Sequence, residues 1–281
     1  MSSETPQKRI IVTRYKTTGQ YFKEDLGNSV GLDMVLIPGG EFLMGAPEDE
    51  PESRDNERPQ HEVSLKPFFM GRYTVTQAQW RVVAGYRQIE RELNADPSRF
   101  KGDNRPVERV NWYDATEFCQ RLSAYTGRKY KLPSEAQWEY ACRAGTTTPF
   151  HFGETITTDL ANYRGIDERW GSYGRGTKGE YREQTTDVGS FLANRFGLHD
   201  MHGNVWEWCE DDYHSSYEGA PTDGTAWIDI DKDRTDTRVG LRGGSWLFGP
   251  NHCRSAFRDD PDPRDLILND VGFRIVCAFQ S

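Results

Sequence analysis

The chain of 281 residues lacks several features that would assign a class of protein directly. It has no apolar run long enough to span a bilayer, and its first residues, MSSETPQKR, do not form a secretory signal. With a net charge of −9, it also has no stripe of Lys and Arg that could bind phosphates. We therefore expect a cytoplasmic protein that binds neither membrane nor nucleic acid.

Paired cysteines and common catalytic loops are missing as well. The sequence has neither a GxSxG motif nor a glycine-rich phosphate loop between a strand and a helix. No CxxC pair occurs, which favours reduced structural thiols over a disulfide framework or a zinc site. Aromatic residues and glycine are plentiful instead, with 8 Trp, 13 Tyr, 14 Phe and 27 Gly. They predict one loop-rich domain whose core is built from large aromatic side chains, with few long helices. The five scattered cysteines are Cys119, Cys142, Cys209, Cys253 and Cys277.

Three helices are predicted from capping boxes, apolar spacing and terminal glycines. The first occupies 76–85, the second 111–127, and the third begins at Ser134. The spacing of apolar residues places Cys119 and Cys142 on the inner faces of the second and third helices. Both thiols are therefore expected in the core.

The remaining segments are predicted from local composition. Residues 1–24 are expected to form an N-terminal arm containing a strand at 8–15, and 32–45 carry the signature of a hairpin. The acidic stretch 46–60 is interpreted as a solvated surface loop. Alternation over 271–279 predicts a strand with one buried face.

Candidate chemical groups are few. Cys253 is the one cysteine in a polar setting, next to His252, but adjacent side chains usually point apart in extended chain, so a partly buried thiol is preferred to a nucleophile. His199 and His202 have the spacing of zinc ligands only on a helix, which the nearby glycines disfavour.

Oxygen ligands offer a better case for a metal site. The stretch DMHGNVWE contains two carboxylates, Asp200 and Glu207, with turn carbonyls at Gly203 and Val205 between them. Calcium takes six to eight oxygen ligands from flexible loops of this kind. The pattern predicts a candidate calcium site, although acidic loops are common.

The stretches IPGGEFLMG, RPVERVNWYDATEFCQRLS, KLPSEAQWEYACRAG, FGLHDMHGNVWEW, LRGGSW and VGFRIVCA together resemble the formylglycine-generating enzyme (sulfatase-modifying factor) family. The resemblance implies a single irregular α+β domain over 25–281, related to the C-type lectin fold and with little regular secondary structure. It also supports structural Ca²⁺ at Asp200, Gly203, Val205 and Glu207. It also implies a second calcium site at Asn162 and the Tyr163 carbonyl, with Glu180 in place of the family's usual Asp.

The family enzyme oxidises a substrate cysteine to formylglycine at a copper ion held by two cysteines. By resemblance, the second cysteine falls on Cys253 and the first on Phe248, and phenylalanine cannot bind copper. No copper and no catalytic residue are therefore expected.

A second resemblance concerns the chain's last forty or so residues. They are similar to the variable region of bacterial diversity-generating retroelement proteins, in which adenines of AAC-type codons are randomised. Such codons never encode Lys, Glu, Gln, Met or Trp, and none of these occurs in 247–270. The resemblance implies a variable region at about 242–278 on a fixed frame. The frame is expected to include Trp246, Cys253, Arg254, Arg258, Gly272, Phe273 and Arg274. The expected ligand contacts are Leu247, Phe248, Gly249, Asn251, His252, Phe257, Asp259, Asp260, Asp262, Asp265, Leu266, Ile267, Leu268, Asn269 and Asp270.

The sequence thus favours a ligand-binding display protein whose partner is a protein. Clustered apolar side chains in an exposed setting usually mark such a site. Two alternatives remain open: a formylglycine-generating type of oxidase that uses Cys253, and a non-catalytic family member with one fixed partner.

Overall fold

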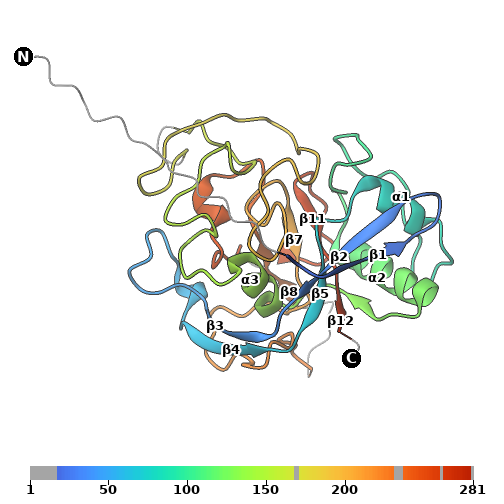
Figure 1. Ribbon diagram of the computed structural model, residues 1–281, viewed down its shortest axis with the longest axis horizontal. Coiled ribbons are helices and arrows are strands. Elements are labelled where there is room, and N and C mark those ends of the chain that lie inside the picture. Colours follow the sequence, from blue (N-terminus) through green and yellow to red (C-terminus); the bar gives the residue numbers. More distant parts are fainter. Residues whose placement is uncertain (1–17, 168–170, 231–236, 260–261, 280–281) are drawn as a thin grey trace, which may run out of the picture.

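The computed structural model describes residues 18–167, 171–230, 237–259 and 262–279 (Figure 1). The strand predicted at 8–15 lies outside these ranges. Among the helices that are described, none is long and apolar enough to cross a membrane.

The three predicted helices are confirmed. They are α1 (Gln77–Ala84), α2 (Trp112–Thr126) and α3 (Glu135–Arg143), and each begins with a reciprocal capping box. The helix α2 ends at Gly127, which adopts a left-handed φ of 75° that glycine accepts without a Cβ clash. Local sequence therefore determines where these helices begin and end.

The strands form several small sheets (Figure 1). The largest has the order β1 (Tyr21–Asp25), β2 (Gly31–Ile37), β5 (Phe68–Gly71), β12 (Val276–Ala278) and β6 (Tyr130–Lys131), with all neighbours antiparallel. The others pair β3 (Gly40–Met44) with β4 (His61–Leu65), β7 (Trp206–Trp208) with both β9 (Leu241–Arg242) and β11 (Val271–Phe273), and β8 (Arg238–Val239) with β10 (Asp262–Pro263). Two short 3₁₀ helices lie at Asp55–Glu57 and Pro250–Cys253.

Three predictions about strands are wrong. β1 belongs to the large sheet, so an arm cannot extend to residue 24. β2 and β3 follow each other but pair with different strands, because Gly39 and Gly40 carry the chain from one sheet to another rather than back in a hairpin. The predicted strand 271–279 is divided at Arg274 into β11 and β12, which join two different sheets and are largely buried on both faces.

Large aromatic side chains fill the core, as the composition predicted. One cluster packs α1 and α2 against the sheets around Trp80, Phe118 and Phe273, whose rings lie within about 6 Å of one another. A second cluster surrounds Trp138 of α3. Cys119 and Cys142 are buried in these two clusters, which confirms their prediction as core residues.

Buried ion pairs fix the last forty residues to the rest of the domain. Five arginines of this segment are at most 2% exposed, and each pairs with a buried carboxylate from earlier in the chain. The pairs are Arg242 with Glu135 and Glu139, Arg254 with Glu50 and Glu57, Arg258 with Glu135, Arg264 with Asp212, and Arg274 with Glu207.

The acidic stretch 46–60 is only partly a solvated loop, so that interpretation needs correction. Glu57 is fully buried and Glu50 is 6% exposed, because both carboxylates accept hydrogen bonds from the Arg254 guanidinium at 2.6–2.7 Å. Burying a carboxylate is costly unless a cation compensates its charge. The loop therefore serves as a partner for the C-terminal segment.

Replacing Arg254 with Met is expected to lower the free energy of unfolding by about 3–5 kcal/mol, because it leaves buried carboxylates without a cation. Urea denaturation measures the loss. The matched control is Arg128→Met, which breaks the exposed pair with Glu24 (3.0 Å) and should cost less than about 1 kcal/mol. Equal effects of the two substitutions would contradict a special role for the buried pair.

Candidate ligand-binding surface

The two ends of the predicted variable region are fastened together at Trp246. Its indole Nε1 donates to the carbonyl of Asn269 (3.3 Å), and the preceding Ser245 donates to the Asp270 carboxylate (2.8 Å). The Trp246 ring also stacks on Tyr181, with a centroid distance of 6.0 Å. These contacts hold the strip 247–252 and the strip 265–269 at a fixed spacing.

The first strip presents half-buried aromatic groups. The ring centroids of Phe248 and His252 lie 5.0 Å apart, and both rings rest on the buried indole of Trp206. Asn251 is half-buried, and its Oδ1 has no hydrogen-bond partner among the described residues. The partly exposed rings of Phe248 and His252 form a surface that can bind an apolar group of a ligand, whereas the Asn251 Oδ1 itself is buried.

Two predicted ligand contacts are wrong. Phe257 is fully buried, because its ring packs against Trp206 and is covered by the Arg54 guanidinium at 4.6 Å. Asp270 is 2% exposed, because it binds Ser245. Both residues belong to the fixed frame.

The second strip is the more exposed one. Ile267 is 51% exposed and Leu268 43%, while Asp265 is also exposed. Leu266 is half-buried and packs against the core. Ile267 lines a cavity of about 580 Å³ together with residues of 94–101 and with Arg109, a contribution that the sequence did not predict. Only the fold brings these segments together.

The remaining predicted ligand contacts are only partly exposed or lie outside the described residues. Leu247, Gly249, Asp259 and Asn269 are half-buried. Asp260 and the side chain of Asp262 lie outside the described residues. The expected frame is buried throughout, with Trp246, Cys253, Arg254, Arg258, Phe273 and Arg274 no more than 6% exposed.

The Cys253 thiol is sealed inside the domain. The side chain is fully buried, and burial raises its pKa. A Cβ atom on Gly244, which has a φ of 74°, would lie 2.6 Å from the Cys253 Sγ, so the turn covers the sulfur closely. The thiol therefore has the environment of an inert core residue.

The residues predicted to bind the first calcium ion offer suitable oxygens. Asp200 is 7% exposed, its Oδ2 accepts from the Gly189 amide, and its Oδ1 has no partner within the described part of the chain. Burial raises the pKa of Asp200 to about 6. Glu207 accepts three hydrogen bonds from Arg274 and Trp138, which leaves one of the roughly four acceptor positions of a carboxylate available. The two carboxylates offer oxygens of the kind that a hard cation prefers, but within the described residues no group of three or more His, Cys, Asp or Glu side chains is arranged to hold a metal ion.

The second predicted calcium site is less complete. The Asn162 Oδ1 is buried and finds no hydrogen-bond donor among the described residues. Tyr163 is fully buried beside it. The Glu180 side chain, however, is 61% exposed and pairs with Arg182 at 2.7 Å. Of the side-chain oxygens of Asn162 and Glu180, that of Asn162 is therefore the one without a partner in the described ranges.

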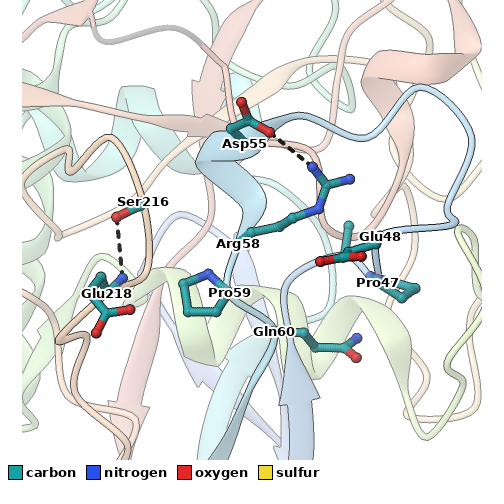
Figure 2. A pocket seen from close by; sticks show the side chains of 9 residues that line it. Pro47, Glu48, Asp55, Arg58, Pro59, Gln60, Ser216 and Glu218 are labelled. Carbon is teal, nitrogen blue, oxygen red and sulfur yellow. Dashed lines mark hydrogen bonds and ion pairs between the residues drawn. The ribbon is translucent and has the colours of Figure 1, made fainter.

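Another cavity of about 580 Å³ opens beside the acidic loop (Figure 2). Figure 2 shows Arg58, which lines the cavity, turned toward Asp55, with which it forms an ion pair of 3.1 Å. Glu48 and Glu218 also line it. Its described lining contains no residue of 242–278, so it lies apart from the candidate surface.

These elements define a single irregular α+β domain of the C-type-lectin-like type, with little regular secondary structure, as predicted. Residues 22–279 match the sulfatase-modifying factor enzyme 1-like domain. The chain therefore belongs to this family, the one that the sequence motifs resemble.

Curated relatives include both catalysts and inactive proteins. The chain is 30% identical to chaperone protein LppX of Paenibacillus barcinonensis, over 89% of this chain and 91% of the relative. It is also 30% identical to inactive C-alpha-formylglycine-generating enzyme 2 of Bos taurus, over 90% of both chains. It is 29% identical to formylglycine-generating enzyme of Streptomyces coelicolor, over 87% and 88%. Family membership alone therefore does not assign an activity.

Two solved structures have the same fold. PvdO from Pseudomonas aeruginosa is 33% identical, with a TM-score of 0.77 over 94% of this chain and 100% of that one. Treponema denticola variable protein 1 is 24% identical, with a TM-score of 0.71 over 93% and 100%. At 24% identity, the likeness to the Treponema protein concerns the fold alone.

Phe257→Ala is expected to lower the free energy of unfolding by about 3–5 kcal/mol, since it opens a cavity under Trp206. Ile267→Asn should change it by no more than about 0.5 kcal/mol, because Ile267 is exposed. Urea denaturation of the two variants makes the comparison. A large loss in Ile267→Asn would show that the second strip belongs to the core.

Proposed function

We propose that this chain is a non-catalytic display protein of a diversity-generating retroelement, which binds a protein ligand through the strips 247–252 and 265–269. The observation that carries the proposal is the separation of two kinds of residue in one segment. Five arginines are buried and ion-paired, while Phe248, His252 and Ile267 between them remain accessible. Substitutions at these accessible positions would therefore leave the five buried ion pairs intact.

The composition of the segment supports variation of this kind. Residues 247–270 contain no Lys, Glu, Gln, Met or Trp, the residues that randomised AAC codons cannot encode. The chain shares its fold with Treponema denticola variable protein 1, and this supports the same conclusion, because a protein named as variable is built on the same fold. Loops held on a rigid frame are a common location for recognition sites.

The surroundings of Cys253 favour binding over oxidation. By the resemblance of the sequence motifs, Phe248 falls where the family enzyme has its first copper cysteine and Cys253 where it has the second. The Cys253 thiol is buried beneath the turn at Gly244. The thiolate is the form that binds copper and attacks a substrate, and burial disfavours this form at Cys253.

The DNA next to the gene provides the most direct test. We expect a reverse-transcriptase gene and a near-copy of the 3′ end of this gene, with AAC or AAT at the codons for Phe248, His252, Ile267 and Leu268. The codons for the buried arginines should be the same in both copies. Absence of any such repeat would contradict diversification and would favour a family member with one fixed partner.

An enzyme assay tests the absence of catalysis independently. Purified chain is incubated with Cu(I), oxygen and a cysteine-containing peptide of the sulfatase type, and aldehyde is measured by mass spectrometry. We expect none. Aldehyde that disappears in the Cys253→Ala variant would overturn the proposal in favour of an oxidase.

We also propose that Asp200 and Glu207, with the carbonyls of Gly203 and Val205, hold a structural calcium ion. The buried Asp200 Oδ1 supports this, since a buried carboxylate oxygen without a partner is costly unless a cation binds it. The ion would supply positive charge and fix the turn before β7.

Millimolar calcium is therefore expected to raise the melting temperature relative to EGTA, because a ligand that binds only the folded state stabilises it. Differential scanning calorimetry measures the difference. Asp200→Asn should abolish it, whereas Asp187→Asn, at an exposed neighbouring position, should not. Identical melting temperatures of the unaltered chain in calcium and EGTA would refute the site.

A further inference from the structure

The groove next to the second strip is lined by segments that are distant in the sequence. Its cavity of about 580 Å³ lies between residues 94–101, the stretch Arg109–Val110 and the exposed side chain of Ile267. Trp80 forms part of the lining, and its indole donates to the Asn94 carbonyl at 2.8 Å. The groove therefore combines a rigid base with one wall contributed by the proposed variable region.

The charges of the groove are unbalanced. Its acidic groups already have partners, since Asp96 pairs with Lys101 at 2.8 Å and Asp114 with Arg91 at 3.4 Å. Arg99 and Arg109 are exposed, and neither has a carboxylate within 4.0 Å in the described ranges. These two guanidinium groups are therefore available to an anionic ligand, even though the net charge of the whole chain is −9.

The backbone holds Arg109 in a fixed position against the variable strip. Arg109 has a φ of 61°, a left-handed conformation that is unfavourable for a residue with a side chain. Its amide donates to the Leu268 carbonyl at 3.0 Å, and the preceding Glu108 is fully buried and bound to Ser98. The position of Arg109 is thus coupled directly to Leu268.

The buried Glu108 carboxylate compensates the positive charge of the Arg109 guanidinium only in part. One of its oxygens accepts from the Phe100 amide at 2.8 Å, and burial raises the pKa of Glu108 to about 7. Near neutral pH, a substantial fraction of Glu108 is therefore uncharged. The groove keeps a net positive character beside an exposed aliphatic side chain.

We propose that this groove binds an acidic peptide segment of the protein ligand, with an Asp or Glu carboxylate between Arg99 and Arg109 and an adjoining apolar side chain against Ile267. The inference rests on the proposed function and names the chemistry of its partner. Guanidinium groups bind carboxylates with two donors each, and complementary charge selects partners. An inorganic anion would leave Ile267 uncovered, so a peptide accounts for more of the lining.

The test begins with a random peptide library displayed on phage, which is selected against the purified full chain. Enriched peptides are synthesised, and their affinities are measured by fluorescence anisotropy. We expect Asp or Glu next to Leu, Ile or Phe in the enriched sequences. Adding inorganic phosphate at the same ionic strength as a chloride control should not displace them.

Substitutions in the chain locate the binding site. Arg99→Glu, Arg109→Glu and Ile267→Asp should each weaken binding at least about tenfold. Arg109→Gly removes the guanidinium while favouring the left-handed backbone, so it should lose affinity with no loss of melting temperature. The control Arg175→Glu reverses an exposed charge outside the groove and should leave affinity unchanged.

The outcomes separate this inference from the proposed function. Peptides that bind the Arg109→Gly variant normally but lose affinity in Phe248→Ala would overturn the groove and leave the display function intact. Enriched peptides without acidic residues, displacement by phosphate alone, or a selection that enriches no peptide would each overturn the inference. A genomic template found together with any of these results would still support diversification.

Discussion

The fold depends on buried ion pairs between arginines near the C-terminus and carboxylates from earlier in the chain. A domain with so few and such short strands cannot rely on long hydrogen-bonded ladders to position its loops. Each guanidinium offers five donors in a planar arrangement, so one side chain can bind several oxygens at once. Arg242 shows this clearly, since it binds Glu135, Glu139 and two backbone carbonyls in a fully buried position. Because a buried charge without its partner is costly, these pairs specify one arrangement of the loops.

Under the proposed function, recognition and stability occupy the same segment, and this mode of fixation explains how both are accommodated. The arginines and Trp246 hold the backbone, so the side chains between them need not contribute to the core. Phe248, His252, Ile267 and Leu268 are accessible, whereas Phe257, only a few residues away, is fully buried beneath Arg54. The exposed side chain of Ile267 lines a groove whose other lining residues, 94–101 and Arg109, lie outside the proposed variable region. A ligand in this groove would therefore contact both proposed variable residues and residues outside that region. A fixed basic wall would set one requirement for all ligands, and the variable strip would select among them.

Sequence reasoning succeeded where the signal is local and failed where it depends on distant partners. The helices were predicted because a capping box involves residues three apart, and Thr76 with Gln79 or Ser134 with Gln137 reveals it directly. The acidic loop was misinterpreted because Glu57 has the same appearance in sequence as a solvated glutamate. Its partner Arg254 lies 197 residues away. The prediction of one strand over 271–279 was wrong for a related reason. Arg274 lies between β11 and β12, outside the strand pairing, and its side chain binds Glu207. The sequence around Arg99 and Arg109 does not indicate that these residues lie near Ile267 in the folded protein.

The sequence by itself determined the family, the starts of the helices, the burial of Cys119 and Cys142, and the burial of the frame residues that it named in the C-terminal segment. These properties follow from residue types and short spacings, which act through local backbone geometry and hydrophobic burial. The tertiary structure alone decided which of the predicted ligand contacts are exposed, which carboxylate compensates the charge of each arginine, and which residues line the groove beside Ile267. The five arginines find partners between 52 and 204 residues away, and such pairs are selected by the geometry and low polarity of the folded interior.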